Sequence, residues 1–297
     1  MTIVIPDDYH AKEALENRRI RCIPAAQAAR QDIRALRIGI LNIMPEAESY
    51  EFNLLFPLGR SVLQITPVWI RLKSHSYSSS NQDHLDRHYV SFEEAVKEHH
   101  LDGLLISGAP VEKMAFEDVT YWQELTEIMD YSRKNIASTL GICWGGLALA
   151  YHVGVPKENY SKKLFGVFET KNLDINHPIT GEMDDLYWCP NSRHAGCDEK
   201  TLQELSSRGE INLLGVSDEA GSIIFETPDH RFVMHLGHFE YDANRLVEEY
   251  NRDKKLGRSD VEPPCHVNLE NPINQWRAQN TEFFTQWIKY VYETTPF

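Results

Sequence analysis

The stretch that decides the fold is Asn135-Ile136-Ala137-Ser138-Thr139-Leu140-Gly141-Ile142-Cys143-Trp144-Gly145-Gly146-Leu147-Ala148-Leu149-Ala150. An apolar, β-branched run ends at Ile142, a cysteine follows, and glycines lead into Ala and Leu residues. This pattern is typical of a strand, a sharp turn and a helix. Glycine lets the backbone turn without a Cβ clash, and a helix start offers unpaired N–H groups that stabilise a thiolate. Cys143 is therefore the candidate nucleophile, although a lone cysteine is also commonly a small buried hydrophobic residue.

A second apolar run, residues 231–236, leads into Gly237-His238-Phe239-Glu240-Tyr241. A cysteine nucleophile needs a base and an acid that orients the base, and both can lie far away in the sequence. His238 and Glu240 supply this pair. His235 lies inside the apolar run and is predicted to be a packed strand residue. A His-x-Glu sequence is common in solvated loops, so its weight comes from the cysteine turn upstream.

The chain has 297 residues, five cysteines and a formal net charge of −14. That charge argues against nucleic acid or an anionic membrane as a partner, because both bind basic surfaces. The cysteines are odd in number and widely scattered, which suggests neither a disulfide framework nor a zinc site. We therefore expect reduced thiols, a cytoplasmic location and no metal. No apolar run approaches the ~18 residues of a membrane-spanning helix.

Strand and helix patterns alternate up to residue 150. Apolar runs at 37–45, 62–70 and 102–110 precede the cysteine strand, and helical patterns cover 47–58, 91–100 and 116–135. Residues 74–86, rich in Ser, His and Asn, are predicted to form a flexible surface loop. The order predicts an α/β fold with a doubly wound, mainly parallel sheet. Gly108 and Cys143 both follow strand ends, which is where ligands bind in such sheets.

After residue 151 the predicted strands are shorter, and their close spacing favours antiparallel additions to the same sheet. They cover residues 163–170, 187–189, 211–216, 222–226 and 232–236, and helices are predicted at 244–255 and 273–292. Residues 1–35 are mostly polar and are predicted to form an N-terminal arm. Residues 36–297 are predicted to form a single catalytic domain. The sequence leaves the oligomeric state open, with a homodimer as one option.

Eight short blocks carry a resemblance to a known family. They are Leu41-Asn42-Ile43-Met44-Pro45, Ser107-Gly108-Ala109-Pro110-Val111-Glu112, Ile142-Cys143-Trp144-Gly145, Phe165-Gly166-Val167-Phe168, Asn191-Ser192-Arg193-His194, Gly237-His238-Phe239-Glu240-Tyr241, Tyr250-Asn251-Arg252-Asp253 and Gln275-Trp276-Arg277. In this order, across nearly the whole chain, they resemble the homoserine O-acyltransferase (homoserine transsuccinylase-like) family. That family has a class I glutamine-amidotransferase-like fold and moves an acyl group from acyl-coenzyme A to an amino-acid hydroxyl. The resemblance implies acetyl-CoA as a co-substrate and no bound cofactor.

The resemblance also implies roles for individual residues. Cys143 would accept the acyl group, His238 would be its general base and Glu240 would orient His238. Glu112 falls where the family selects acyl length, since a carboxylate there goes with acetyl and a glycine with succinyl.

On the acceptor side, the resemblance implies that Arg252 holds the carboxylate of the amino acid. Lys163 and Ser192 would also contact the substrate. From the residues alone, Arg252 has a second interpretation, namely a surface helix arginine paired with Glu248 or Glu249.

The predicted chemistry is attack by Cys143 on the acetyl-CoA thioester. The expected oxyanion donors are the backbone amides of Trp144 and of the Gly108-Ala109 turn. Transfer from a thioester to an oxygen ester is downhill and needs neither a metal nor ATP. The resemblance favours L-homoserine as the acceptor, which would give O-acetylhomoserine for methionine synthesis.

Other hypotheses stay open at this point. Relatives usually carry a lysine two residues after the first-strand proline, and no lysine follows Pro45 closely here. Serine, the acceptor that would belong to cysteine synthesis, is therefore the main alternative. A succinyl donor, a glutamine amidohydrolase with the same Cys, His and Glu geometry, and a binding protein with an inactive triad are further alternatives.

Overall fold

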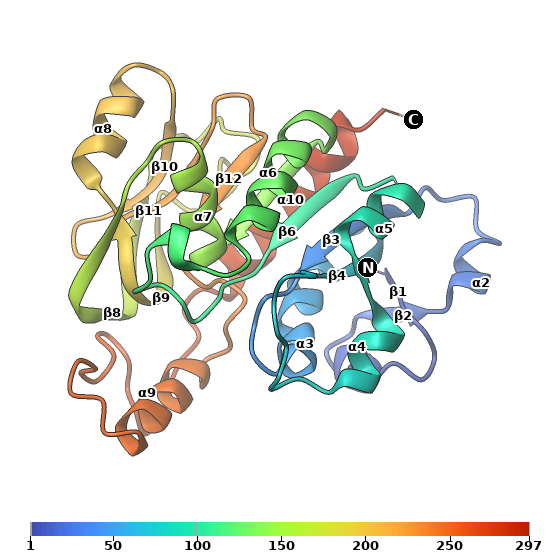
Figure 1. Cartoon of the computed structure of the whole chain (residues 1–297), viewed down its shortest axis with the longest axis horizontal. Coiled ribbons are helices and arrows are strands. Elements are labelled where there is room, and N and C mark those ends of the chain that lie inside the picture. Colours follow the sequence, from blue (N-terminus) through green and yellow to red (C-terminus); the bar gives the residue numbers. More distant parts are fainter. Residues whose placement is uncertain (1, 99, 297) are drawn as a thin grey trace.

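The computed structural model describes residues 2–98 and 100–296, which form one large sheet with helices on both faces (Figure 1). The strands lie in the order β2-β1-β4-β3-β6-β7-β12-β11-β10-β8-β9, and β5 also pairs with β4. The strands are β1 Thr2–Val4, β2 Arg21–Ile23, β3 Leu36–Leu41, β4 Gln64–Arg71, β5 Tyr89–Ser91, β6 Gly103–Ile106, β7 Ser138–Ile142, β8 Lys157–Asn172, β9 Leu186–Cys197, β10 Asn212–Ser217, β11 Gly221–Glu226 and β12 Phe232–His235. The helices are α1 Lys12–Asn17, α2 Ala25–Ala28, α3 Ala47–Leu58, α4 Gln82–His88, α5 Phe92–Glu98, the 3-10 helix η1 Phe116–Asp118, α6 Trp122–Asn135, α7 Trp144–His152, α8 Glu199–Ser207, α9 Arg245–Lys255 and α10 Arg277–Thr294.

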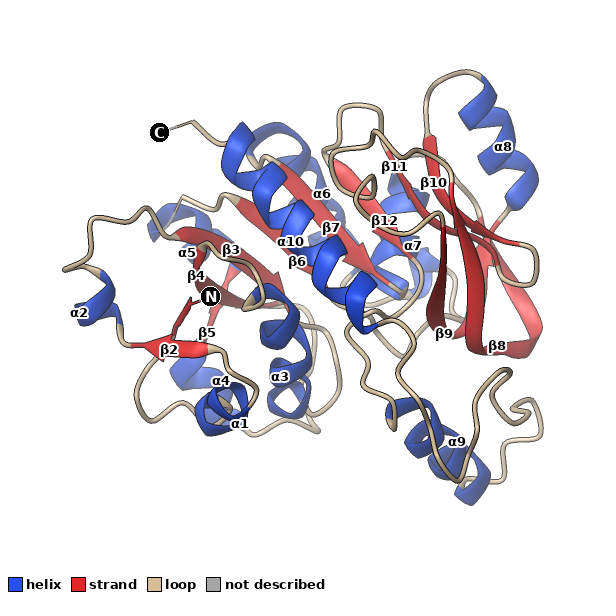
Figure 2. Cartoon of the chain, turned by 180° about the vertical axis from the view of Figure 1, so that it is seen from behind, coloured by secondary structure: helices blue, strands red, loops and turns tan. Residues whose placement is uncertain are grey.

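The middle of the sheet is parallel. Strands β4, β3, β6, β7 and β12 pair in that order with parallel register, so their carboxyl ends meet at one edge. Helices α3 and α10 lie side by side over one face, and α6 and α7 cover the other (Figure 2). The buried apolar residues accordingly form two clusters, one containing Leu54 and Trp287 and the other Leu125 and Leu147. These features confirm the predicted doubly wound α/β fold.

Antiparallel strands extend the sheet beyond β12, as predicted. Strand β11 pairs antiparallel with β12 and β10, and β8 joins β10 to β9. Strand β9 is much longer than the predicted 187–189. The polar residues after Cys189 give no strand pattern in the sequence, but partners distant in the sequence bury them in the sheet. The guanidinium of Arg193 is 1% exposed and donates to the Tyr160 hydroxyl at 2.6 Å and to the Ala220 carbonyl at 2.7 Å.

Two short strands within the predicted N-terminal arm, β1 and β2, form one edge of the sheet. Strand β1 pairs in parallel with both β2 and β4. Ile3 and the α1 residue Leu15 are fully buried in the same apolar cluster as α3. Strands of three residues are too short to give an alternating pattern, so the sequence did not reveal them.

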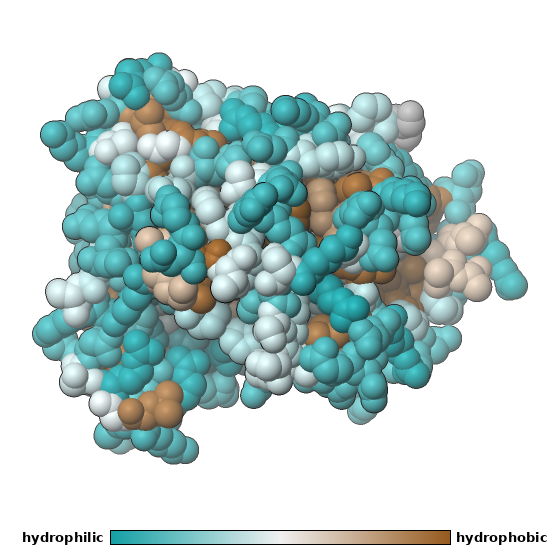
Figure 3. All heavy atoms as spheres, in the orientation of Figure 1, coloured by the Kyte–Doolittle hydropathy of each residue, from teal (hydrophilic) through white to brown (hydrophobic). Residues whose placement is uncertain are grey.

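Two further local predictions differ from the structure. Helix α4 begins at Gln82, inside the predicted 74–86 loop, and the hydroxyl of Ser80 in that loop accepts the amide of Ala47 at the start of α3. The helix predicted at 116–135 is divided into η1 and α6. Among the described residues no helix is both long and apolar enough to cross a bilayer. The face seen in Figure 3 is mainly hydrophilic, with small scattered hydrophobic areas.

Candidate active site

Cys143 lies at a sharp turn between β7 and α7, as predicted. Its backbone has φ 52° and ψ −113°, a conformation that non-glycine residues rarely adopt. Two glycines allow helix and sheet to approach this closely. A Cβ on Gly145 would lie 2.4 Å from the Ile106 carbonyl oxygen, and one on Gly141 would lie 2.5 Å from the Gly145 oxygen. The turn therefore holds Cys143 at the carboxyl end of the central strands, with the amide of Trp144 opening the helix.

His238 follows β12, the strand next to the one that ends before Cys143, and lines the same cavity. Strand β12 pairs with β7, and the Cys143 amide donates to the His235 carbonyl at 2.8 Å. His235 itself is 1% exposed and packs in the strand, as predicted. Three residues later the His238 amide donates to the Pro190 carbonyl at 2.8 Å, which fixes the loop after β12.

Glu240 lies behind His238. The Nδ1 of His238 and the Oε1 of Glu240 are 2.6 Å apart, and the same oxygen accepts the Tyr50 hydroxyl at 2.5 Å. Burial disfavours the charged imidazole, but the Glu240 carboxylate and the Cys143 thiol raise the pKa of His238 well above its usual value. The His238 ring also stacks on Tyr241, with ring centroids 4.1 Å apart. This arrangement favours an imidazolium next to the sulfur.

A cavity of about 240 Å³, the Cys143 pocket, contains most of the predicted site residues. Eight of the ten line it, and the other two, Glu240 and Trp144, are buried behind His238 and Cys143. Those eight are Gly108, Ala109, Glu112, Cys143, Lys163, Ser192, His238 and Arg252. Gly108 is next to the nucleophile, since a Cβ built on it would lie 3.6 Å from the Cβ of Cys143.

Glu249, on α9, is the main side chain of this pocket that the sequence did not single out as functional. It is 6% exposed and accepts hydrogen bonds from the Ser192 hydroxyl at 2.5 Å and the Tyr241 hydroxyl at 2.8 Å. Lys163 and Arg245 each lie 3.4 Å from it. Burial alone would raise its pKa, but Lys163 and Ser192 lower the pKa of Glu249 to about 2. The sequence does contain a signal, because Arg245, Glu249 and Arg252 have the spacing of one helix face.

Lys163 and Arg252 both pair with Asp253. The Nζ of Lys163 is 3.0 Å from Asp253, and its side chain is only 4% exposed. Arg252 binds Asp253 through Nε at 3.0 Å and Nη2 at 2.9 Å, and its side chain is 55% exposed. Its partner is thus neither of the glutamates that the sequence suggested. Half of Arg252 stays accessible at the pocket.

Glu112 lines the same cavity and follows the Gly108-Ala109 turn. It is half-buried, and burial raises the pKa of its carboxyl group, an effect that Lys163 and His238 partly offset. The ammonium of Lys157 donates to the Glu112 carbonyl and fixes the backbone there.

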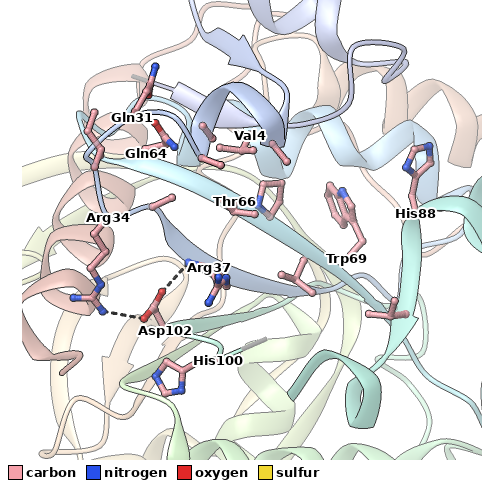
Figure 4. A pocket seen from close by; sticks show the side chains of 18 of the residues that line it. Val4, Gln31, Arg34, Arg37, Gln64, Thr66, Trp69, His88, His100 and Asp102 are labelled. Atoms are coloured by element: carbon pink, nitrogen blue, oxygen red, sulfur yellow. Dashed lines mark hydrogen bonds and ion pairs between the residues drawn. The ribbon is translucent and has the colours of Figure 1, made fainter. Parts of the chain in front are cut away.

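A larger cavity, about 790 Å³, lies at the β1–β4 edge of the sheet (Figure 4). Arg34 forms an ion pair with Asp102 there at 3.1 Å, and Asp102 also accepts the Arg37 amide at 2.7 Å. None of the predicted site residues lines this cavity. The smaller cavity is therefore the candidate active site, because the predicted nucleophile and base line it and the predicted acid lies behind the base.

Two histidine–glutamate clusters lie outside both cavities. Their potential ligand atoms are within 4.8 Å of one another, in His10, Glu51 and His84 and in His177, Glu226 and His230. In the second cluster Nδ1 of His177 accepts the Thr180 amide at 3.2 Å, so the proton is on Nε2, which donates to Glu226 at 2.9 Å. Hydrogen bonds account for that arrangement.

The fold and the site together define a class of protein. A glutamine amidotransferase from Thermotoga maritima superposes with a TM-score of 0.56 at 14% identity, covering 87% of this chain and 99% of that one. One from Methylobacillus flagellatus gives 0.50 at 13% identity, over 89% and 94% of the two chains. This likeness shows the class I glutamine amidotransferase-like fold, here with a cysteine, a histidine and a glutamate at the strand ends.

Within that fold, the chain belongs to the homoserine O-succinyltransferase family, whose sequence profile matches residues 2–297. Relatives named homoserine O-acetyltransferase are similar over the whole chain. The protein from Bacillus subtilis (strain 168) is 40% identical over 100% of this chain and 99% of its own length. Those from Clostridium botulinum (strain Alaska E43) and Petrotoga mobilis are both 41% identical over 100% of this chain, and over 98% and 97% of their own. The resemblance carried by the eight sequence blocks is confirmed, and the protein is an acyltransferase.

Proposed function

We propose that this protein transfers an acetyl group from acetyl-CoA to the hydroxyl of L-homoserine through a thioester on Cys143. The observation that carries the proposal is Cys143 at a strained strand–helix turn, in one pocket with His238 and backed by Glu240. The relatives support the acceptor and the acyl group, since their names specify homoserine and acetyl.

In the first half of the reaction, the Cys143 thiolate attacks the thioester carbonyl of acetyl-CoA. The raised pKa of His238 favours a protonated imidazole in this pocket, and an imidazolium near a cysteine stabilises the thiolate that attacks. The amides of Trp144 and of the Gly108-Ala109 turn are the proposed donors to the oxyanion, and losing one such donor typically costs ~3 kcal/mol. The bond to the coenzyme A sulfur then breaks, and His238 gives its proton to the departing thiolate.

In the second half, the acceptor replaces coenzyme A. Neutral His238 takes the proton from the homoserine hydroxyl, and the oxygen attacks the acetyl carbon. The bond to the Cys143 sulfur breaks, which restores the thiolate and the imidazolium. Glu240 stabilises the imidazolium whenever it forms, because its carboxylate is 2.6 Å from Nδ1.

The acceptor side of the pocket is the wall formed by α9, β8 and β9. Arg252 is the proposed clamp for the carboxylate of homoserine, with its guanidinium plane fixed by Asp253. Lys163 and Ser192 would contact the acceptor from positions fixed by Glu249.

The donor side includes Glu112. An acetyl group is uncharged and fits next to this carboxylate, whereas a succinyl group would bring a second negative charge into a partly desolvated site. We place the reaction in the cytoplasm, as a step towards methionine, because all five cysteines are unbridged, which fits a reducing compartment.

The test is the intact mass of the protein after mixing with acetyl-CoA. We expect one added acetyl group, which L-homoserine removes faster than L-serine does. Cys143→Ala should abolish the adduct, and Cys265→Ala is the matched control because Cys265 is exposed and outside the pocket. An adduct on the Cys143→Ala protein would refute the assignment of the nucleophile. If serine removes the acetyl group faster than homoserine, the acceptor is serine. Release of ammonia from glutamine would indicate an amidohydrolase.

A further inference from the structure

A third cavity, about 600 Å³, lies on the far side of the loop that carries Glu240, and we call it the arginine pocket. Its lining comes from residues 17–19 at and after the end of α1, from α3 and the turn after it, from residues 239–244, and from residues around the start of α10. The lining includes four arginines, Arg18, Arg19, Arg60 and Arg277. Phe239, Glu240 and Tyr241 also line it, so this cavity and the Cys143 pocket share Tyr241.

The four arginines of this pocket form no ion pairs with the carboxylates of the described residues. Within residues 2–98 and 100–296, none of the four guanidinium groups forms an ion pair with a carboxylate, although the chain has 44 acidic residues against 30 Lys and Arg. Every cation lining the Cys143 pocket is paired. Those pairs are Lys113–Asp260, Lys163–Asp253, Arg245–Glu249, Arg252–Asp253 and Arg258–Asp260. In an acidic protein, the uncompensated positive charge next to the active site is thus concentrated in the arginine pocket.

Two other features of the pocket suit an anion with an aromatic part. Helix α10 starts here at Arg277, has no acidic residue in its first turn and points the positive end of an 18-residue helix dipole at the cavity. The rings of Phe52 and Phe56 stack with centroids 5.7 Å apart, and the guanidinium of Arg18 lies 5.2 Å from the Phe56 centroid. Phenyl faces and guanidinium planes together are the groups that stack on a nucleobase.

Two acidic side chains, Glu240 and Asp242, also line the pocket. The Oε1 of Glu240 binds His238 and Tyr50, and the Oδ1 of Asp242 accepts the Asn244 amide at 2.9 Å. The net charge of the lining residues remains positive, with four arginines against Glu240 and Asp242.

We propose that the arginine pocket binds the phosphate groups of an adenine nucleotide. Two ligands could supply these phosphate groups, namely the 3′-phosphorylated ADP end of coenzyme A and a free nucleotide. The first rests on the proposed function and would place the donor's anionic end next to the loop of Glu240, with its flexible arm leading to Cys143. The second would make the pocket a separate effector site that contacts the catalytic loop.

The probe is adenosine 3′,5′-bisphosphate, and its binding is measured by calorimetry on the full chain. We expect binding to the wild-type protein, and at least about tenfold weaker binding to Arg60→Gln and to Arg277→Gln, since each loses a charge-assisted contact. Arg30→Gln is the matched control, because Arg30 is exposed and lies outside the pocket. No binding to the wild-type protein, or equal binding by all four proteins, would overturn the proposal.

Acetyl-CoA distinguishes the two sources. If it displaces the probe, the pocket holds the donor's nucleotide end, and the two pocket variants should raise KM for acetyl-CoA about as much as they weaken the probe, with KM for the acceptor unchanged. If it does not displace the probe, the ligand is a free nucleotide. The binding measurement needs no acyl transfer, so a protein that binds the probe but fails to acetylate homoserine would refute the proposed function and leave the pocket assignment standing.

Discussion

Replacing Glu249 by glutamine would remove one charge from a side chain that is 6% exposed, while keeping its shape. The magnitude follows from its contacts. Lys163 and Ser192 outweigh the effect of burial and lower the pKa of Glu249 from 4.5 to about 2. At about 1.4 kcal/mol per pH unit, this difference corresponds to about 3 kcal/mol of folding stability at neutral pH.

The pH dependence has a definite sign. A carboxyl group whose pKa is lower in the folded protein contributes its full stabilisation above pH 4.5 and loses it as the pH falls towards 2. The difference in free energy of unfolding between the wild-type protein and Glu249→Gln should therefore be about 3 kcal/mol at pH 7 and roughly half of that at pH 3.

The assay is urea unfolding followed by circular dichroism at both pH values. Glu248→Gln is the matched control, since Glu248 is the preceding residue of α9 and its side chain is 65% exposed. It should change stability by less than about 0.5 kcal/mol. The reasoning is refuted if Glu249→Gln is as stable as Glu248→Gln at pH 7, or if their difference does not shrink between pH 7 and pH 3.

Three further predictions concern other groups. Glu112→Gly should raise kcat/KM for succinyl-CoA relative to acetyl-CoA by roughly ten- to a hundredfold, since two carboxylates about 5 Å apart repel by up to about 3 kcal/mol. An unchanged ratio of the two kcat/KM values would show that other residues select acyl length. Tyr50→Phe removes the hydroxyl bonded to Glu240 and should lower kcat by about tenfold with a shifted pH profile and an unchanged KM, whereas a wild-type profile would exclude a positioning role. Glu226 raises the pKa of His230, so this pair stabilises the fold below pH 6.5 and less so as the pH rises through the folded pKa. His230→Gln should accordingly lower Tm at about pH 5.5 and less at about pH 9, and an equal loss at both would contradict the coupling.

The central fold could be predicted because its signals are local. Helix α3 has the predicted bounds 47–58. The strand before Cys143 is an apolar run that can be recognised from its own residues alone. The edges could not be predicted in the same way. Strands β1 and β2 have three residues each, and most of β9 is buried by contacts such as Arg193 with Ala220, 27 residues away.

The same distinction between local and distant signals applies to the residues of the candidate site. Cys143 and His238 follow the ends of two strands, so the rule for parallel sheets brings them together. Glu249 lies on a polar helix, where a glutamate normally faces solvent. Its burial depends on Lys163, 86 residues away in the sequence, and no local pattern predicts that pairing.

The two walls of the Cys143 pocket therefore depend on different physics. The proposed reacting groups are placed by backbone geometry, namely the turn at Cys143 and the pairing of β12 with β7. The wall that we propose for the acceptor is placed by ion pairs between α9 and the antiparallel strands, chiefly Lys163 with Asp253 and Glu249. A substitution in that wall can change which hydroxyl is held near His238 without moving the sulfur, because the turn makes no use of those side chains. Formation of the proposed thioester and choice of the acceptor should consequently be separable by mutation.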